Sequence, residues 1–451
     1  PIYAPVIEVS GRTYPVEVEY MPLGLQDGDE DDPECEVEEL DLRNGILKAL
    51  KFLFKEHGRA DTLVFLPGER EIMDIAAFLK KAHLPNTEIL SLYARLATAE
   101  QNKIFSPHST VRVVLCTNVA ETSLTVPGIK YVIDPGTARI SRYSPRTKVQ
   151  RLPVEKISQA SANQRKGRCG RVSEGVCVRL YSEEDFLSRT EFTDPEILRT
   201  NLAAVILQMV ALHLGNITKF PFIDPPQMRQ VTDGIRLLEE VGAINDAKGK
   251  GTDEIELTKI GVALSKIPAD PRLSRMLVQA DKEGALSEVL VIVSALAVMD
   301  PRERPLDKQE QSRQAHHRFD DEKSDFLSYL NLYKYICQLQ TKMSNSALRK
   351  RLKAEYISYL RVREWFDLLR QLRASCQSLK YRSNEVPSTY EAIHRAILSG
   401  LLSQIGHYED NDKGMYLGAR GVKFVIHPSS VLCKKKPKWI CSAELNEINI
   451  K

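Results

Sequence analysis

The residues with the clearest chemical potential form one short arginine stretch, Gln164-Arg165-Lys166-Gly167-Arg168-Cys169-Gly170-Arg171. Read as a continuous helix, it places Gln164, Arg168 and Arg171 on one face, because they lie four and seven residues apart. Arginine is always charged, and its planar guanidinium forks onto phosphate oxygens. Each glycine costs a helix about 1 kcal/mol relative to alanine, so two glycines here indicate close approach to another surface. We therefore predict a polyphosphate contact, against the alternative of a solvated basic helix.

A second candidate is the hydroxyl stretch, residues 117–128, which follows a run typical of a buried strand. Short hydroxyls and backbone amides at a strand end can hold phosphate oxygens without reading a base. The pattern also fits a capped helix start, with Thr117 or Asn118 as the cap and Glu121 in the first turn. Both readings can hold, because a capped helix N-terminus is itself an anion site. The side chains expected to bind phosphate are Asn118, Thr122 and Ser123.

A third candidate is Gly68-Glu69-Arg70-Glu71, directly after another apolar run. A glycine at that point permits close approach of the backbone to a ligand, so Gly68 and Arg70 are candidate nucleic-acid contacts. The alternative is a plain turn from strand to helix, with acidic residues in the first helical turn.

Residues 139–171 carry ten Lys or Arg and a single acid, Glu155. Because apolar residues are interleaved with the charges, we interpret the block as a folded basic surface rather than a tail. Residues 139–153 are expected to form an exposed hairpin that turns near Ser144-Pro145-Arg146, with a solvated basic ribbon as the alternative. The expected phosphate contacts of the hairpin are Arg142, Arg146, Lys148 and Arg151. A lysine-rich loop, residues 434–438, is either a further backbone contact or an exposed charged loop.

Between these candidate stretches, the sequence alternates regularly between short apolar runs and amphipathic segments. The expected strands cover residues 14–20, 62–66, 88–92, 111–116, 131–134 and 176–181, with a further strand at 6–9. The expected helices between them cover residues 40–57, 69–82 and 98–105. Strands and helices in this order predict a doubly wound α/β fold, whose ligand site lies beyond the carboxyl ends of the strands.

The character of the sequence changes near residue 194. Expected helices at 197–214, 231–241 and 258–267, with a short strand at 254–257, suggest a winged helix. Residues 271–379 are almost entirely helical in pattern, and one more helix is expected at 390–402. The remainder alternates as in a small β barrel of the OB-fold type, with too few strands to close.

Composition excludes several classes of protein. The 451 residues have a net charge of only +3, and a strongly acidic segment at 27–41 is expected to be exposed. None of the eight cysteines forms a Cys-x-x-Cys pair or shows zinc spacing, so we expect no metal site and reduced thiols in a cytoplasmic protein. No apolar run approaches the length of a membrane span. Because the sequence opens at Pro1-Ile2-Tyr3 without a methionine, we expect it to be a fragment.

Together, the stretches resemble the motifs of superfamily 2 helicases of the DEAH-box branch, in order and spacing, and are most similar to the bacterial HrpA type of RNA helicase. Residues 63–72, 116–128 and 164–171 resemble motifs IV, V and VI. Residues 194–197, 222–226, 257–261 and 268–271 resemble the winged-helix signatures of the branch. The resemblance covers essentially the whole chain.

The resemblance implies five parts: an interdomain linker with the first strands at 1–22, a second RecA-like domain at 23–190, a winged-helix domain at 191–268, a ratchet-like helical bundle at 269–388, and an incomplete OB-fold-like domain at 389–451. It implies that ATP is hydrolysed between two RecA-like lobes, with Mg²⁺ and nucleotide held mainly by the first. Gln164, Arg168 and Arg171 would then reach the γ-phosphate, and Glu121 would contact the nucleotide.

The implied partner is single-stranded RNA or a ribonucleoprotein, such as mRNA or the ribosome, moved in the 3′-to-5′ direction by a monomer. Neither Gly-x-x-x-x-Gly-Lys-Ser/Thr nor Asp-Glu-x-His occurs in the sequence, so the phosphate cradle and magnesium carboxylates are missing. We therefore expect a fragment without the first RecA-like domain that hydrolyses no ATP alone. A non-enzymatic RNA-binding module with a helicase-like fold is the alternative.

Two positions depart from the family pattern. Pro127 stands where many relatives have Asp, which puts one polar contact to the nucleotide in doubt. Phe326 replaces a frequent His at the start of the helix that is thought to ratchet along RNA.

Overall fold

The computed structural model describes residues 5, 7, 14–23, 41–94, 96, 98–144, 149–245, 254–305, 308–409 and 414–447. The chain divides into two compact units. Unit 1 comprises Pro1–Ile140 and Leu152–Asp194, and unit 2 comprises Ser141–Arg151 and Pro195–Lys451. The expected strand at 6–9, most of the acidic segment, Arg146 and Lys148 lie outside the described residues.

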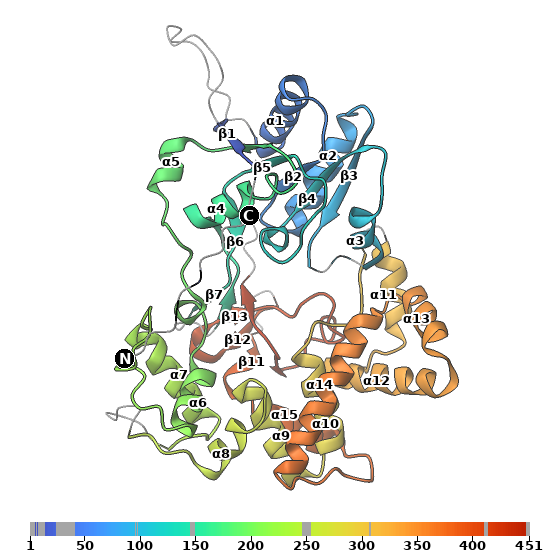
Figure 1. The fold of residues 1–451 in the computed structure, drawn as a ribbon. Coiled ribbons are helices and arrows are strands. Elements are labelled where there is room, and N and C mark those ends of the chain that lie inside the picture. The colour runs from blue at the N-terminus through green and yellow to red at the C-terminus, as the bar shows by residue number, and fades with distance from the viewer. Residues whose placement is uncertain are drawn as a thin grey trace. The chain divides into compact units, whose positions relative to one another are not determined.

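Unit 1 is built on a six-stranded sheet in which every neighbouring pair is parallel, in the order β1-β10-β5-β2-β4-β3. The strands are β1 Val16–Tyr20, β2 Thr62–Phe65, β3 Thr87–Leu92, β4 Val111–Cys116, β5 Tyr131–Asp134 and β10 Gly175–Arg179. The helices of this unit are α1 Leu42–Glu56, α2 Glu69–Lys81, α3 Thr98–Phe105, α4 Gln159–Lys166 and α5 Glu183–Ser188. Figure 1 shows α1 and α2 packed against the sheet. The predicted doubly wound parallel sheet is confirmed.

Alternate residues of each central strand enter different apolar cores, as the twofold period of a strand requires. Val64 of β2 packs in a cluster with α1 and α2, which contribute Leu50 and Ile75. Leu63 and Phe65 pack in the cluster on the other face. Because both faces are buried, the strands appear in the sequence as continuous apolar runs.

The carboxyl ends of β2, β4 and β5 lie side by side and position the candidate stretches together. The backbone N–H of Leu66 donates to the carbonyl of Cys116 at 2.7 Å, which aligns the ends of β2 and β4. Gly68 therefore follows one strand end while the hydroxyl stretch follows its neighbour.

The prediction that the arginine stretch is one helix is wrong. Helix α4 begins after the cap Ser158, whose hydroxyl accepts from the N–H of Ser161, and ends at Lys166 with Gly167 as its C-terminal cap. Two glycines within four residues make continuation costly, because glycine is a poor helix former. Gln164 is thus helical, whereas Arg168 and Arg171 lie in the turns that follow.

Unit 2 begins with three short helices: α6 Ala203–Ala211, α7 Met228–Glu240 and α8 Lys259–Ser265. The helix expected at 197–214 is interrupted, since the Asn201 side chain accepts from the N–H of Ala203 at 2.8 Å and restarts the helix there. The preceding residues form only the 3₁₀ turn η2 Glu196–Leu198. The strand expected at 254–257 is reduced to a single bridge between Ile244 and Leu257.

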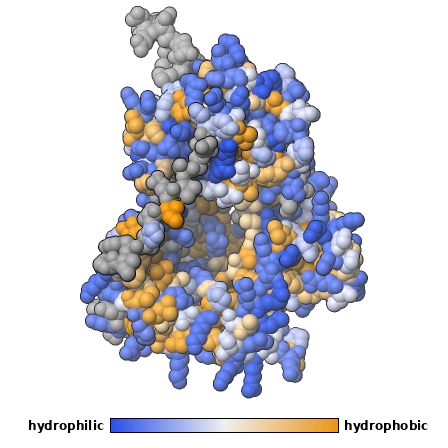
Figure 2. All heavy atoms as spheres, in the orientation of Figure 1, coloured by the Kyte–Doolittle hydropathy of each residue, from blue (hydrophilic) through white to orange (hydrophobic). Residues whose placement is uncertain are grey.

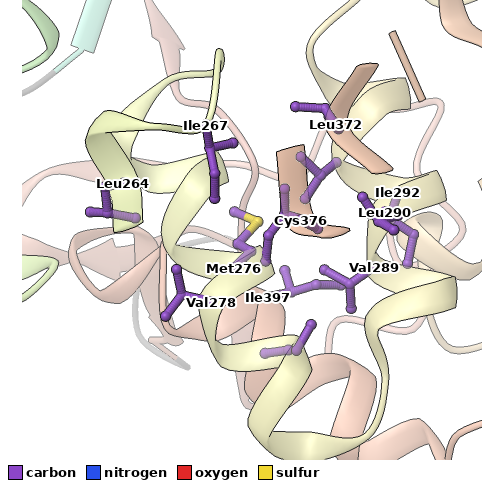
Figure 3. Close-up of a cluster of buried hydrophobic side chains, with 14 of the residues drawn as sticks. Leu264, Ile267, Met276, Val278, Val289, Leu290, Ile292, Leu372, Cys376 and Ile397 are labelled. Atoms are coloured by element: carbon purple, nitrogen blue, oxygen red, sulfur yellow. The ribbon is translucent and has the colours of Figure 1, made fainter. Parts of the chain in front are cut away.

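The helical region predicted at 271–379 is confirmed. Its helices are α9 Pro271–Glu283, α10 Leu286–Leu296, α11 Gln309–His317, α12 Asp325–Lys342, α13 Asn345–Ala354 and α14 Tyr359–Ser378, and α15 Tyr390–Leu398 follows. Figure 3 shows Met276 and Val278 of α9, Val289 of α10, Cys376 of α14 and Ile397 of α15 meeting in one apolar cluster. This shared core makes the region a single packed body.

After α15 comes a four-stranded antiparallel sheet in the order β13-β12-β11-β14, as expected for a small barrel element. Its strands are β11 Ile405–Tyr408, β12 Tyr416–Gly418, β13 Lys423–Phe424 and β14 Trp439–Cys441. On the face drawn in Figure 2, apolar and hydrophilic side chains are interspersed. Across the part of the chain that the structure describes, no helix is both long and apolar enough to cross a membrane.

Candidate functional site

An ion pair that is closed to solvent lies at the centre of the site. Arg165 of α4 places Nη1 2.7 Å from Oδ1 of Asp134, the last residue of β5, and the two side chains are 1% and 0% exposed. The Arg165 guanidinium also donates to the carbonyl of Thr137 and lies 4.7 Å from the centre of the Phe65 ring. Burial alone would lower the pKa of Arg165, but the carboxylates of Asp134 and Glu121 raise it. Arg165 therefore stays charged and locks α4 to the sheet.

Glu121 belongs to the same network. Its Oε2 accepts from Arg165 Nε at 3.1 Å, and its Oε1 accepts from the Ser161 hydroxyl at 2.6 Å. Both carboxylate oxygens thus hold α4 against the hydroxyl stretch. The contact of Glu121 with nucleotide stays a prediction, and the geometry gives this residue a structural task.

The three residues expected to face the nucleotide differ in exposure. Arg168 is only 8% exposed, and its guanidinium donates to the backbone carbonyls of Glu121 and Leu124. Burial, and then the charge of Arg171, lower the pKa of Arg168. Arg171 is exposed and donates to the Thr125 hydroxyl at 2.5 Å.

Gln164 is exposed, and its side chain makes no hydrogen bond to any residue that the structure describes. The arginine stretch thus offers two accessible groups, on Gln164 and Arg171. Its third group, on Arg168, is already bound to the hydroxyl stretch.

The hydroxyl stretch leaves its candidate side chains available. A single 3₁₀ turn, η1 Asn118–Ala120, follows β4, and the Thr117 side chain makes no capping bond. A longer capped helix is therefore not formed. Asn118, Thr122 and Ser123 are exposed, and within the described residues their side chains have no hydrogen-bond partner. These polar groups lie in the loop that follows β4, where side chains of this kind can bind phosphate oxygens.

Gly68 is buried beneath an ion pair that joins distant parts of the sequence. Arg139 Nη2 lies 2.9 Å from Glu71 Oε1, and a Cβ at Gly68 would stand 2.7 Å from both Arg139 Nε and Glu71 Oε2. A side chain at this position would displace the ion pair from its place over the start of α2. Arg70, by contrast, is exposed.

The predicted hairpin is present and divides between the two units. In unit 1, β6 Thr137–Arg139 pairs with β9 Val154–Lys156. In unit 2, β7 Arg142–Ser144 pairs with β8 Val149–Arg151, which places Arg142 directly opposite Arg151. β8 also pairs in parallel with β15 Asn446–Glu447. Like charges that stand directly opposite one another destabilise a strand pair.

The outer part of the hairpin is fixed to α7. The Tyr143 hydroxyl donates to Oδ2 of Asp233 at 2.7 Å, and the Tyr143 N–H donates to the carbonyl of Arg199 at 2.8 Å. Burial, and then the hydrogen bond to Asp233, raise the pKa of Tyr143. Asp233 is 4% exposed and also accepts from the Asn201 amide at 3.0 Å.

Two residues that position the site were not singled out from the sequence. Arg165 was passed over in favour of its neighbours, although a buried strand that ends in Asp134 requires a counter-charge. Arg139 was assigned only to the basic block and to the start of the expected hairpin. Among the described residues, no group of three His, Cys, Asp or Glu side chains could hold a metal ion.

Comparison with known proteins places the chain among helicases. Residues 45–173 match the helicase conserved C-terminal domain, residues 270–329 match the ratchet-like helicase-associated domain HA2, and residues 393–449 match an oligonucleotide/oligosaccharide-binding OB-fold. The chain is 57% identical to the ATP-dependent RNA helicase HrpA of Escherichia coli K12, over 98% of this chain and 33% of that protein. It is 55% identical to the HrpA homolog of Haemophilus influenzae, again over 98% of this chain and 33% of that protein.

A human relative, the probable ATP-dependent RNA helicase DHX35, is 30% identical over 98% of this chain and 60% of that protein. The crystal structure of the E. coli DExH-box NTPase HrpB has a TM-score of 0.67 at 23% identity, over 95% of this chain and 44% of that one. This likeness supports the fold alone. The chain spans about one third of the length of the two bacterial relatives.

Proposed function

Because the chain belongs to the HrpA-type DEAH RNA helicases, we propose that it forms the part of an ATP-dependent RNA helicase that grips RNA and supplies arginines to the nucleotide site. The single observation that carries the proposal is the contact between the arginine and hydroxyl stretches. Arg168 holds the carbonyls of Glu121 and Leu124, between which the candidate phosphate ligands Thr122 and Ser123 lie. A change at the nucleotide that moves Arg168 would therefore also move the hydroxyl stretch that binds RNA.

On the nucleotide side, we propose that Gln164, Arg168 and Arg171 face the γ-phosphate. Mg²⁺-ATP, held mainly by a first RecA-like domain, would supply that phosphate. Within the described residues, the Arg171 side chain makes one hydrogen bond, to the exposed Thr125 hydroxyl. Phosphate oxygens would replace that hydroxyl. An arginine that stabilises the charge of this transition state can raise the rate by ~10³ or more. If Arg168 turned toward the γ-phosphate, it would release the two carbonyls and alter the hydroxyl stretch.

On the RNA side, Asn118, Thr122 and Ser123 would bind successive phosphates, with Arg70 and the backbone near Gly68 beside them. The outer hairpin would add Arg142 and Arg151, together with Arg146 and Lys148. Contacts of this kind bind the backbone rather than the bases, so binding would tolerate many sequences and weaken with salt. Movement would be 3′ to 5′ along single-stranded RNA, by a monomer.

The alternative is an RNA-binding module without catalysis, and one observation favours it. The guanidinium of Arg168 donates to the backbone carbonyls of Glu121 and Leu124, which gives this arginine a purely structural role. Such a module would hold RNA equally with and without ATP, even when a P-loop domain is present.

The RNA grip can be tested on this chain directly. Thr122→Val is nearly isosteric and removes one exposed hydroxyl, and Thr87→Val serves as a control because Thr87 lies at the start of β3. We expect Thr122→Val to weaken binding of single-stranded RNA several-fold and Thr87→Val to leave it unchanged. Equal affinities for both variants and the parent chain would contradict the assignment.

A further inference from the structure

A surface hollow of about 320 Å³ lies in the helical part of unit 2, beside α12 and the end of α11. Nothing in the proposed mechanism uses it. The hollow is shallow and open to solvent. The lining residues are Arg318, Phe319, Asn331, Lys334, Tyr335 and Gln338.

One wall of the hollow is aromatic and cationic. The rings of Phe319 and Tyr335 lie 5.2 Å apart between centroids. The Arg318 guanidinium stands 4.6 Å from the first ring and 4.4 Å from the second, and the Arg318 side chain is 40% exposed. Planar bases stack on aromatic rings and on guanidinium planes of this kind.

The charges around the hollow favour an anion. Arg318 and Arg351 both pair with the single carboxylate of Glu355, each at 2.7 Å, so this group of three side chains has a net charge of +1. The Tyr335 hydroxyl also donates to Glu355, at 2.8 Å, and this carboxylate is only 11% exposed. Helix α13, which contributes Arg351, also carries Arg349, Lys350 and Lys353 and no acid, whereas acids follow Phe319 at positions 320–322. Clustered basic residues of this kind attract phosphate.

Two hydrogen-bond donor side chains at the rim of the hollow make no polar contact that stabilises the described part of the fold. Lys334 and Gln338 are exposed and lie one helical turn apart on α12. Neither side chain has a hydrogen bond or ion pair within the described residues. An ammonium and an amide on the same helix face can together hold one phosphate group.

We propose that this hollow binds a nucleotide, with the base against the wall of Arg318, Phe319 and Tyr335 and the phosphate on Lys334 and Gln338. The nucleotide is either one residue of a bound RNA strand, which rests on the proposed function, or a free mononucleotide. The site is separate from the arginine and hydroxyl stretches, because all its residues belong to the helical part of unit 2.

The test compares Lys334→Ala with the matched control Lys342→Ala, which removes the same charge from an exposed position at the end of α12. Binding of a single-stranded oligouridylate is measured over a range of salt concentrations. Loss of one phosphate contact should weaken binding several-fold and reduce the slope of log K against log salt by about 0.7 for a single strand. The control should match the parent chain. Circular dichroism verifies that both variants are folded.

A second arm titrates AMP into the chain and follows the side-chain amide signals of Asn331 and Gln338 by NMR. Shifts that Lys334→Ala abolishes, with an unchanged RNA slope, identify a free mononucleotide as the ligand. If Lys334→Ala changes the salt dependence of oligouridylate binding, the ligand is one residue of a bound RNA strand. If the parent chain binds RNA but neither arm responds to Lys334→Ala, the inference is overturned while the proposed RNA grip stands. If the parent chain binds no RNA, the proposed function fails, and the AMP arm alone decides on the hollow.

Discussion

Nη1 of Arg165 lies 2.7 Å from Oδ1 of Asp134, and both side chains are closed to solvent. The pair joins α4 to the end of β5, and through Glu121 it also holds the hydroxyl stretch. Asp134 has two further donors, the N–H of Gly136 and the Tyr181 hydroxyl. The site is thus assembled around a buried charge pair that is closed to solvent.

Arg165→Met should destabilise unit 1 strongly. Removal of one partner leaves the carboxylate of Asp134 buried without a counter-charge, which costs about 3–5 kcal/mol. Urea unfolding of the variant measures the loss. Arg70→Ala is the control, because Arg70 is exposed on α2. A midpoint for Arg165→Met that equals that of the control would show that the pair does not hold the site together.

The two glycines of the arginine stretch should respond in opposite ways to alanine. A Cβ at Gly170 would lie 2.6 Å from Val16 Cγ2 and 2.8 Å from the carbonyl oxygen of Tyr14, so Gly170→Ala should cost about 1–3 kcal/mol. At Gly167 the nearest atoms are 3.5 Å away and φ is −62°, so Gly167→Ala should be neutral or stabilising by up to about 1 kcal/mol. Thermal unfolding measures the Tm of both variants. Equal shifts in Tm for Gly170→Ala and Gly167→Ala would refute the packing argument.

Tyr143→Phe should loosen the outer hairpin without unfolding the chain. The substitution keeps the ring but removes a donor from the buried carboxylate of Asp233, at a cost of about 1–3 kcal/mol. Hydrogen exchange at Tyr143 and Ser144 should become faster. Tyr390→Phe is the control, since the Tyr390 hydroxyl makes no hydrogen bond within the described residues. Exchange rates unchanged from those of the parent chain would show that α7 does not fix the hairpin.

The sheet could be predicted because both faces of its central strands are buried, which leaves a continuous apolar run such as residues 63–66. The site could be predicted in outline, because parallel strands end at one edge. The end of α4 was missed because residue spacing describes a helix face but not where the helix stops. The ion pair that covers Gly68 was not predicted, because Glu71 and Arg139 are 68 residues apart in the sequence and no local pattern connects them.

The central claim is that the arginine stretch serves the γ-phosphate of ATP. It is tested most directly by RNA-stimulated ATP hydrolysis in a longer protein that carries this chain together with a P-loop domain. Arg171→Ala should reduce turnover by ~10³ or more, and Arg171→Lys should restore little of it, because lysine lacks the planar fork. RNA affinity without nucleotide should stay close to that of the parent protein, and this chain alone should show no hydrolysis. Unchanged turnover in Arg171→Ala would contradict the account.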